Sequence, residues 1–146
     1  MRPACPAAFA RVVRLALFVA LLGFVATRAT AQTTYTWNQT GTASYATATN
    51  WTPTRTTPAT NDVLVFDNGA TTTVTGVPAQ TIGQLTVTNS TNVTLQAAAT
   101  GTLTISATGA ALSVGAGSQL NVNTATALTL ALPAGSTGSI SGAIWA

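Results

Sequence analysis

The side chains that could catalyse a reaction are few and lie in one segment. From Gln32 onward the chain has two carboxylates, Asp62 and Asp67, one base, Arg55, and no His, Lys, Glu or Cys. Two carboxylates could act as acid and base in glycoside hydrolysis. These two bracket a short apolar run five positions apart, so on a strand they would point to opposite faces. With no thiol or imidazole to bind zinc or attack a carbonyl, we predict no catalytic residue, no metal ligand and no cofactor, and a protein that is not an enzyme.

The sequence around the two carboxylates indicates local structural roles for them. Asp67-Asn68-Gly69 is typical of a turn. Asp62 precedes the apolar run 63–66, where its side chain can bond nearby backbone N–H groups. Enzymes that cleave acidic polysaccharides on a β-helix need clustered carboxylates beside a base, and Arg55 is the one base after the leader. A remnant of such an enzyme is therefore kept only as an alternative.

Residues 1–31 have the features of a secretory signal peptide. Three arginines precede an uncharged apolar run, residues 15–26, and Ala29-Thr30-Ala31 supplies the small-x-small cleavage pattern. A membrane-spanning helix would need about 20 apolar residues, and Arg28 closes this run too early. We predict cleavage before Gln32, a secreted or cell-surface location, and no membrane span in the mature chain.

Removal of that segment changes the charge of the chain. One Arg against two Asp gives the mature part a formal charge of −1. Binding of nucleic acid needs clustered Lys and Arg, so we predict no nucleic-acid partner. Threonine accounts for 29 residues from Gln32 onward, and its branched Cβ favours strands.

Six pairs of apolar residues, each pair two positions apart, recur along residues 85–130. The steps between the first members of successive pairs are 8, 10, 9, 8 and 8 residues. Alternation within a pair predicts a strand with one buried face, and a nearly constant step indicates a repeat architecture. The pairs are Leu85 and Val87, Val93 and Leu95, Leu103 and Ile105, Leu112 and Val114, Leu120 and Val122, and Leu128 and Leu130.

The turns between these strands lack the Asn-Gly or Asp-Gly pairs of two-residue hairpins. The apolar positions also keep the same residue type from strand to strand, as stacked layers require. We therefore predict an all-β, right-handed parallel β-helix with an aromatic-rich N-terminal cap, and an antiparallel β-sandwich as runner-up. Three faces would give coils of about 26 residues and two faces about 18, and the spacing does not choose. The predicted parts are the signal, a cap with the first strand at 32–70, and repeats at 71–146 that form an incomplete array.

The cap segment carries a pattern of aromatic residues. Residues 35–51 read YTWNQTGTASYATATNW, and Pro58 and then NDVLVFDNG at 61–69 follow. This pattern resembles the leader of large secreted bacterial β-helix proteins, including the autotransporter-associated β-strand repeat and adhesin-like proteins. The resemblance covers the leader and first coils, departs at Tyr45, where many members have Trp, and carries over no catalytic residue. The matching positions are Trp37, Asn38, Gly41, Asn50, Trp51, Pro58, Asp62, Val63 and Phe66.

Two hypotheses account for the leader aromatics Trp37, Tyr45 and Trp51. They could be a glycan contact, since flat rings stack on sugars. They could instead be a hydrophobic lid over the first open end of the solenoid, because terminal repeats act as caps. The second hypothesis also explains why the aromatics precede the repeats.

The chain ends with the opening of another coil, residues 138–145. Either Ile144 and Trp145 fold over the open end, or the coil stays uncovered and its free strand edges permit self-association. The sequence predicts a structural or adhesin-like surface protein that presents outward Thr and Asn rows to glycans or neighbouring surface proteins. A carbohydrate-binding module that uses the leader aromatics is the alternative binding function.

Overall fold

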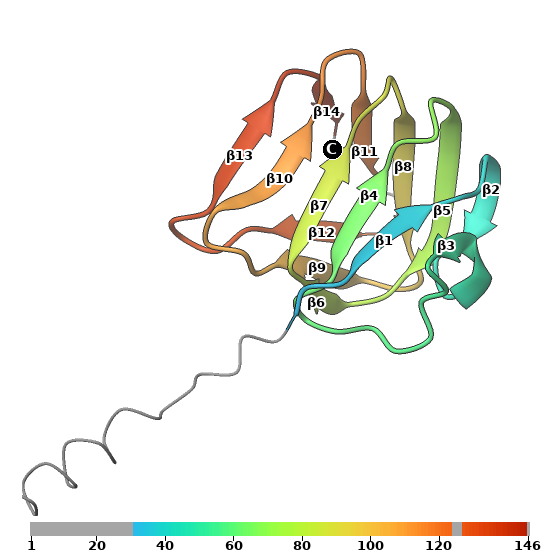
Figure 1. Cartoon of the computed structure of the whole chain (residues 1–146), viewed down its shortest axis with the longest axis horizontal. Helices are drawn as coiled ribbons and strands as arrows, with labels where there is room; N and C mark the ends of the chain where they lie inside the picture. The colour runs from blue at the N-terminus through green and yellow to red at the C-terminus, as the bar shows by residue number, and fades with distance from the viewer. Residues whose placement is uncertain (1–30, 124–126, 146) are drawn as a thin grey trace, which may run out of the picture. The chain divides into compact units, whose positions relative to one another are not determined.

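The computed structural model describes residues 31–123 and 127–145, which form a β-solenoid of about four turns (Figure 1). The predicted signal peptide, apart from Ala31, lies outside the described residues. Each coil supplies one strand to each of three sheets, and the turns between strands are short. No helix in the described ranges is long and apolar enough to span a membrane.

The three sheets lie on the three sides of the solenoid. In Figure 1, sheet A faces the viewer, sheet B lies behind it and sheet C lies below. Sheet A contains β13 (Thr137–Ile140), β10 (Ala110–Val114), β7 (Gln84–Val87), β4 (Val63–Phe66), β1 (Thr34–Trp37) and β3 (Trp51–Thr52) in that order. Sheet B contains β14 (Ala143–Trp145), β11 (Gln119–Val122), β8 (Asn92–Ala97), β5 (Thr71–Val77) and β2 (Gly41–Ser44). Sheet C contains β12 (Leu128–Ala131), β9 (Gly101–Ile105) and β6 (Gln80–Ile82), and a 3-10 turn, Ala48–Asn50, precedes β3.

Parallel pairing between successive coils confirms the β-helix and excludes the antiparallel sandwich. The β1–β3 pair is antiparallel, and the other strand pairs of the described residues are parallel. The registers also decide the number of faces, which the sequence left open. Leu112 pairs with Leu85, Leu120 with Val93 and Leu130 with Leu103. Each step is 27 residues, so the coil has three faces.

The six apolar pairs of the sequence occupy the six consecutive strands β7 to β12. Their side chains point inward and stack in rows, one above its equivalent in the next coil. Eleven of the twelve are buried, and the twelfth, Leu130, packs against the same core half-buried. Since burial of an aliphatic side chain contributes about 1.5–3 kcal/mol, these rows supply most of the driving force for a chain without disulfides.

The solenoid begins earlier in the chain than the predicted boundary at residue 70. Strands β1, β2 and β4 already belong to sheets A and B. We predicted a turn-rich loop over residues 41–50, and this was wrong for β2, which pairs in parallel with β5. Its Thr and Ala side chains carry little apolar signal, so the neighbouring strand, and not the local sequence, fixes it as a strand.

Side chains at the turns between sheets A and B tie successive coils together. Asn68 Nδ2 donates to the Gln39 carbonyl (2.6 Å), and Asn89 Nδ2 donates to the Asp67 carbonyl one coil later (2.7 Å). The predicted turn at Asp67 is confirmed, because Gly69 has φ +66° and Asn68 Oδ1 accepts from the Ala70 N–H (3.1 Å). Polar side chains thus satisfy backbone groups that strand pairing leaves free.

Candidate functional site

The leader aromatics form one cluster over the first coil. Trp37 and Trp51 pair edge-to-face on the antiparallel strands β1 and β3, with ring centroids 4.9 Å apart. Tyr45 lies 5.3 Å from Trp51 in the same geometry, and Phe66 lies 5.7 Å from it. The cluster rests on the inward side chains of β4 and β5. The structure therefore brings together all three residues predicted from the leader.

Their burial separates the two hypotheses for this cluster. Trp37 is 1 % exposed, Trp51 2 % and Tyr45 4 %. The indole N–H groups are satisfied inside the fold: Trp37 Nε1 donates to Thr72 Oγ1 and Trp51 Nε1 to the Tyr45 carbonyl, each at 3.0 Å. A sugar-stacking platform needs an open ring face, and none of these three rings has one. The arrangement fits the lid, and it does not fit glycan contact through the ring faces.

Beneath this lid lies a buried ion pair that the sequence did not predict. Arg55 Nε donates to Asp62 Oδ2 (2.9 Å), and both side chains are at most 2 % exposed. Arg55 Nη2 lies 2.8 Å from the same oxygen as an electrostatic contact and makes no hydrogen bond. The Ala59 N–H also donates to Asp62 Oδ2 (2.9 Å), which confirms the predicted local backbone bond. One signal could have predicted the pair: Arg55 is the one base that a buried acid of the mature chain could find.

Aromatic rings surround the guanidinium of Arg55. Its Cζ lies 5.5 Å from the ring centroid of Tyr35, 5.4 Å from Tyr45 and 5.7 Å from Trp51. Such cation–π contacts are worth about 2 kcal/mol or more when the cation is desolvated. Because the pair is neutral as a unit and enclosed by rings, its geometry serves packing.

Tyr45 links the ion pair to sheet C. Its hydroxyl accepts from Arg55 Nη1 (3.1 Å) and from the Gln80 amide. Gln80 stands at the head of the inward row that Leu103 and Leu130 continue. Burial raises the pKa of Tyr45 above its usual 10.0, and the positive charge of Arg55 opposes this rise. A cavity of about 240 Å³ beside these three residues is lined further by Thr56 and Pro58.

The two carboxylates do not form a catalytic pair. Asp62 is sequestered with Arg55, while Asp67 lies exposed on the turn after β4. No group of three His, Cys, Asp or Glu side chains that could hold a metal ion occurs within residues 31–123 and 127–145.

The outward positions of the strands carry hydroxyl and amide side chains in register. On sheet B, Thr73 of β5 pairs with Thr94 of β8, which pairs with Asn121 of β11. Asn121 Nδ2 donates to Asn92 Oδ1 (2.9 Å). On sheet C, Thr102 pairs with Thr129. These predicted outward residues are half-buried or exposed, so their polar atoms are within reach of solvent.

The final coil is uncovered. Trp145 is 62 % exposed and Ile140 54 %, so neither closes the end of the solenoid. The alternative in which Ile144 and Trp145 fold over the end was wrong for Trp145. β14 pairs Trp145 with Asn121 of β11, in line with the outward row of sheet B.

Comparisons of the chain with protein-family models, with curated proteins and with solved structures found no match.

Proposed function

We propose that this chain is a non-enzymatic structural or adhesin-like protein, exported to the cell surface, that presents a Thr/Asn-rich solenoid. The resemblance of the leader to secreted bacterial β-helix proteins and the signal-like residues 1–31 support export. The paired outward rows of sheet B carry the functional part of the proposal, because they repeat one hydroxyl or amide group per coil on a regular support.

The charge of the surface favours a neutral partner. Arg55 and Asp62 are buried, so Asp67 is the one exposed charged side chain of the described residues. An acidic polymer would find no base to pair with, and a basic one a single acid. A neutral polysaccharide or a neighbouring chain can instead exchange hydrogen bonds with the Thr and Asn rows, each contact weak, and repetition supplies avidity.

The alternatives have less support. A carbohydrate-binding module that uses the leader aromatics would need the rings of Trp37, Tyr45 and Trp51 to be open, and they are buried. A remnant of a polysaccharide-degrading enzyme would need acidic residues on a coil face, where the described strands carry Thr, Ser, Asn and Gln.

Retention on insoluble polysaccharides tests the proposal. We expect the purified chain to be retained on neutral polymers, to pass through uronic-acid polymers, and to release no soluble sugar from either. The double variant Thr73→Val/Thr94→Val removes two stacked hydroxyls but keeps the branched shape, so it should lower retention severalfold. Thr86→Val on sheet A is the matched control. Equal retention of all three proteins would refute the role of the sheet B rows, and turnover of any polymer would refute the non-enzymatic proposal.

A further inference from the structure

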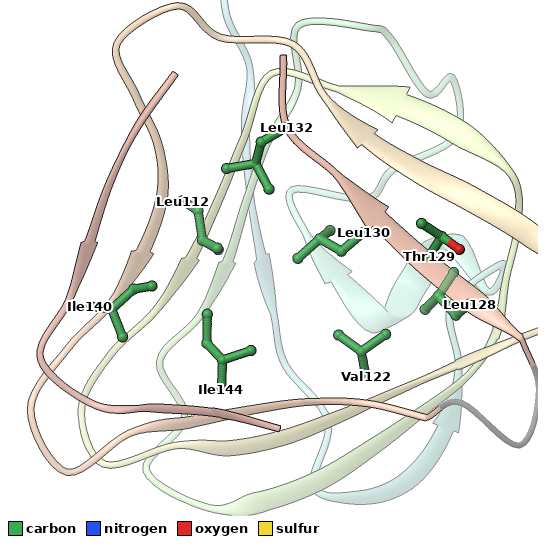
Figure 2. Close-up of a pocket in the computed structure, with 8 residues that line it drawn as sticks. All are labelled: Leu112, Val122, Leu128, Thr129, Leu130, Leu132, Ile140 and Ile144. Carbon is green, nitrogen blue, oxygen red and sulfur yellow. The ribbon is translucent and has the colours of Figure 1, made fainter. Parts of the chain in front are cut away.

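The open end of the solenoid has the composition of a protein core. A cavity of about 540 Å³ lies there between the last strands of the three sheets. Figure 2 shows the side chains of Leu112, Leu130, Ile140 and Ile144 directed toward a common interior space. Leu132 is 41 % exposed and Ile140 54 %. Gly138 contributes to the hollow, because it follows Leu112 in the inward row of sheet A and has no side chain to fill the space.

The strand edges at this end are unpaired and unprotected. In the described residues β13, β14 and β12 are the last strands of sheets A, B and C. Proteins usually protect free edges with charged residues, Lys above all. The sequence contains no charged residue after Asp67. Two copies of this end would therefore meet without repulsion between side chains.

The other end cannot receive it. At the N-terminal end of sheet A, β3 pairs antiparallel with β1, and the buried rings of Trp37, Trp51 and Tyr45 cover the core. A head-to-tail filament would need that end to be open. The surface that matches the open end in aliphatic lining and in free edges is the open end of a second copy.

The topology selects one symmetry for such a pair. Each coil rises by one strand spacing, about 4.8 Å, so each side of an evenly wound coil climbs about 1.6 Å. β14 follows β13 in the same coil and lies one such step above it, while β12 precedes β13 and lies one step below. A two-fold axis through the middle of sheet A places β13 on β13 of the second copy and β14 on its β12. The step up then meets the step down, and all three edges close together as antiparallel pairs.

An axis through sheet B or sheet C does not achieve this. It would leave the three edges mismatched by one full strand spacing, about 4.8 Å, which is too far for backbone hydrogen bonds. We therefore propose that two copies of this chain associate through their C-terminal coils about a two-fold axis in sheet A, with the aliphatic side chains at the end forming one shared core. This inference rests on the proposed function in one respect, since it identifies the neighbouring chain as a second copy.

Sedimentation equilibrium of the purified chain at rising concentration tests the association. We expect a closed dimer with no larger species. Ile140→Lys places a charge at the centre of the interface and should give a monomer that keeps its strand signal in circular dichroism. Ala99→Lys, on the exposed turn between β8 and β9, should leave the dimer intact. A monomer at every concentration, or a growing series of oligomers, would overturn the proposal.

Single cysteines test the axis, because the predicted mature chain contains no other thiol. Ser139→Cys on β13 lies beside the proposed axis and should form an intermolecular disulfide, which needs Cα atoms within about 7 Å. Thr129→Cys on β12 would face β14 of the second copy and should stay reduced. A dimer in which Ser139→Cys stays reduced, or Thr129→Cys is the one that oxidises, overturns the axis. Retention of Ile140→Lys on polysaccharide, measured in parallel, shows whether the proposed surface function holds independently.

Discussion

Arg55 and Asp62 form an ion pair inside the N-terminal cap, with 2.9 Å between Nε and Oδ2 and both side chains at most 2 % exposed. The pair fixes the irregular segment after β3 to the start of β4. Desolvation of two charges is costly, and here three aromatic rings, the Tyr45 hydroxyl and the Ala59 N–H offset part of that cost. The cap is therefore a packed unit and not a flexible leader.

Removal of one member of this pair should destabilise the protein strongly. Arg55→Met leaves Asp62 buried without its cation, and we expect a loss of about 3–5 kcal/mol in the free energy of unfolding. The measurement is urea denaturation of the purified chain.

The double variant Arg55→Met/Asp62→Asn is the control for that prediction. It removes both charges and should recover a substantial part of the loss. Additive effects of Arg55→Met and Asp62→Asn in this cycle would contradict a direct interaction between the two side chains.

Trp51 tests the lid. Its ring contacts Trp37, Tyr45 and Phe66, so Trp51→Ala should cost about 3–5 kcal/mol, as other buried Trp→Ala changes do. Differential scanning calorimetry should show a lower Tm. Polysaccharide retention below the new Tm should not change, because the ring does not reach the surface. A variant that keeps its Tm but loses retention would instead restore the glycan-contact hypothesis.

Tyr45 should make the protein sensitive to alkali. Burial raises the pKa of its hydroxyl in the folded state above 10.0, while in the unfolded chain it ionises near 10. The stability contributed by the neutral hydroxyl is thus complete below pH 10 and is lost as the pH rises through the folded-state pKa. The free energy of unfolding should fall between pH 9 and 11, as about one proton per molecule is released.

Tyr45→Phe is the variant for that experiment. It should be less stable at neutral pH by about 1–3 kcal/mol, because Arg55 Nη1 and the Gln80 amide lose their acceptor. Its stability should depend less on pH above 9 than that of the unmodified chain, which Tyr35 and the other groups still affect. Identical slopes for the two proteins would show that Tyr45 is not responsible.

The sequence by itself determined the strands of the regular coils, the inward residues and the parallel winding. Spacing such as that of Leu85 and Val87 allows one strand face to be buried, and a constant step requires each strand to stack on its equivalent. The turn at Asp67–Gly69 was also local, because its conformation depends on Asn68 and Gly69 alone. These features involve residues close together in the chain, or exact repetition, and so leave a pattern.

Only the tertiary structure decided the features that depend on distant contacts. The 27-residue coil and its three faces follow from which strands pair, and β2 becomes a strand because β5 lies beside it. The leader rings proved to be buried because Thr72 and Phe66 from the next coil enclose them. The Arg55–Asp62 pair and the ramp of unpaired edges at β12, β13 and β14 have no periodic signal. They arise from where the winding of the chain brings single residues and strand ends, which no local pattern encodes.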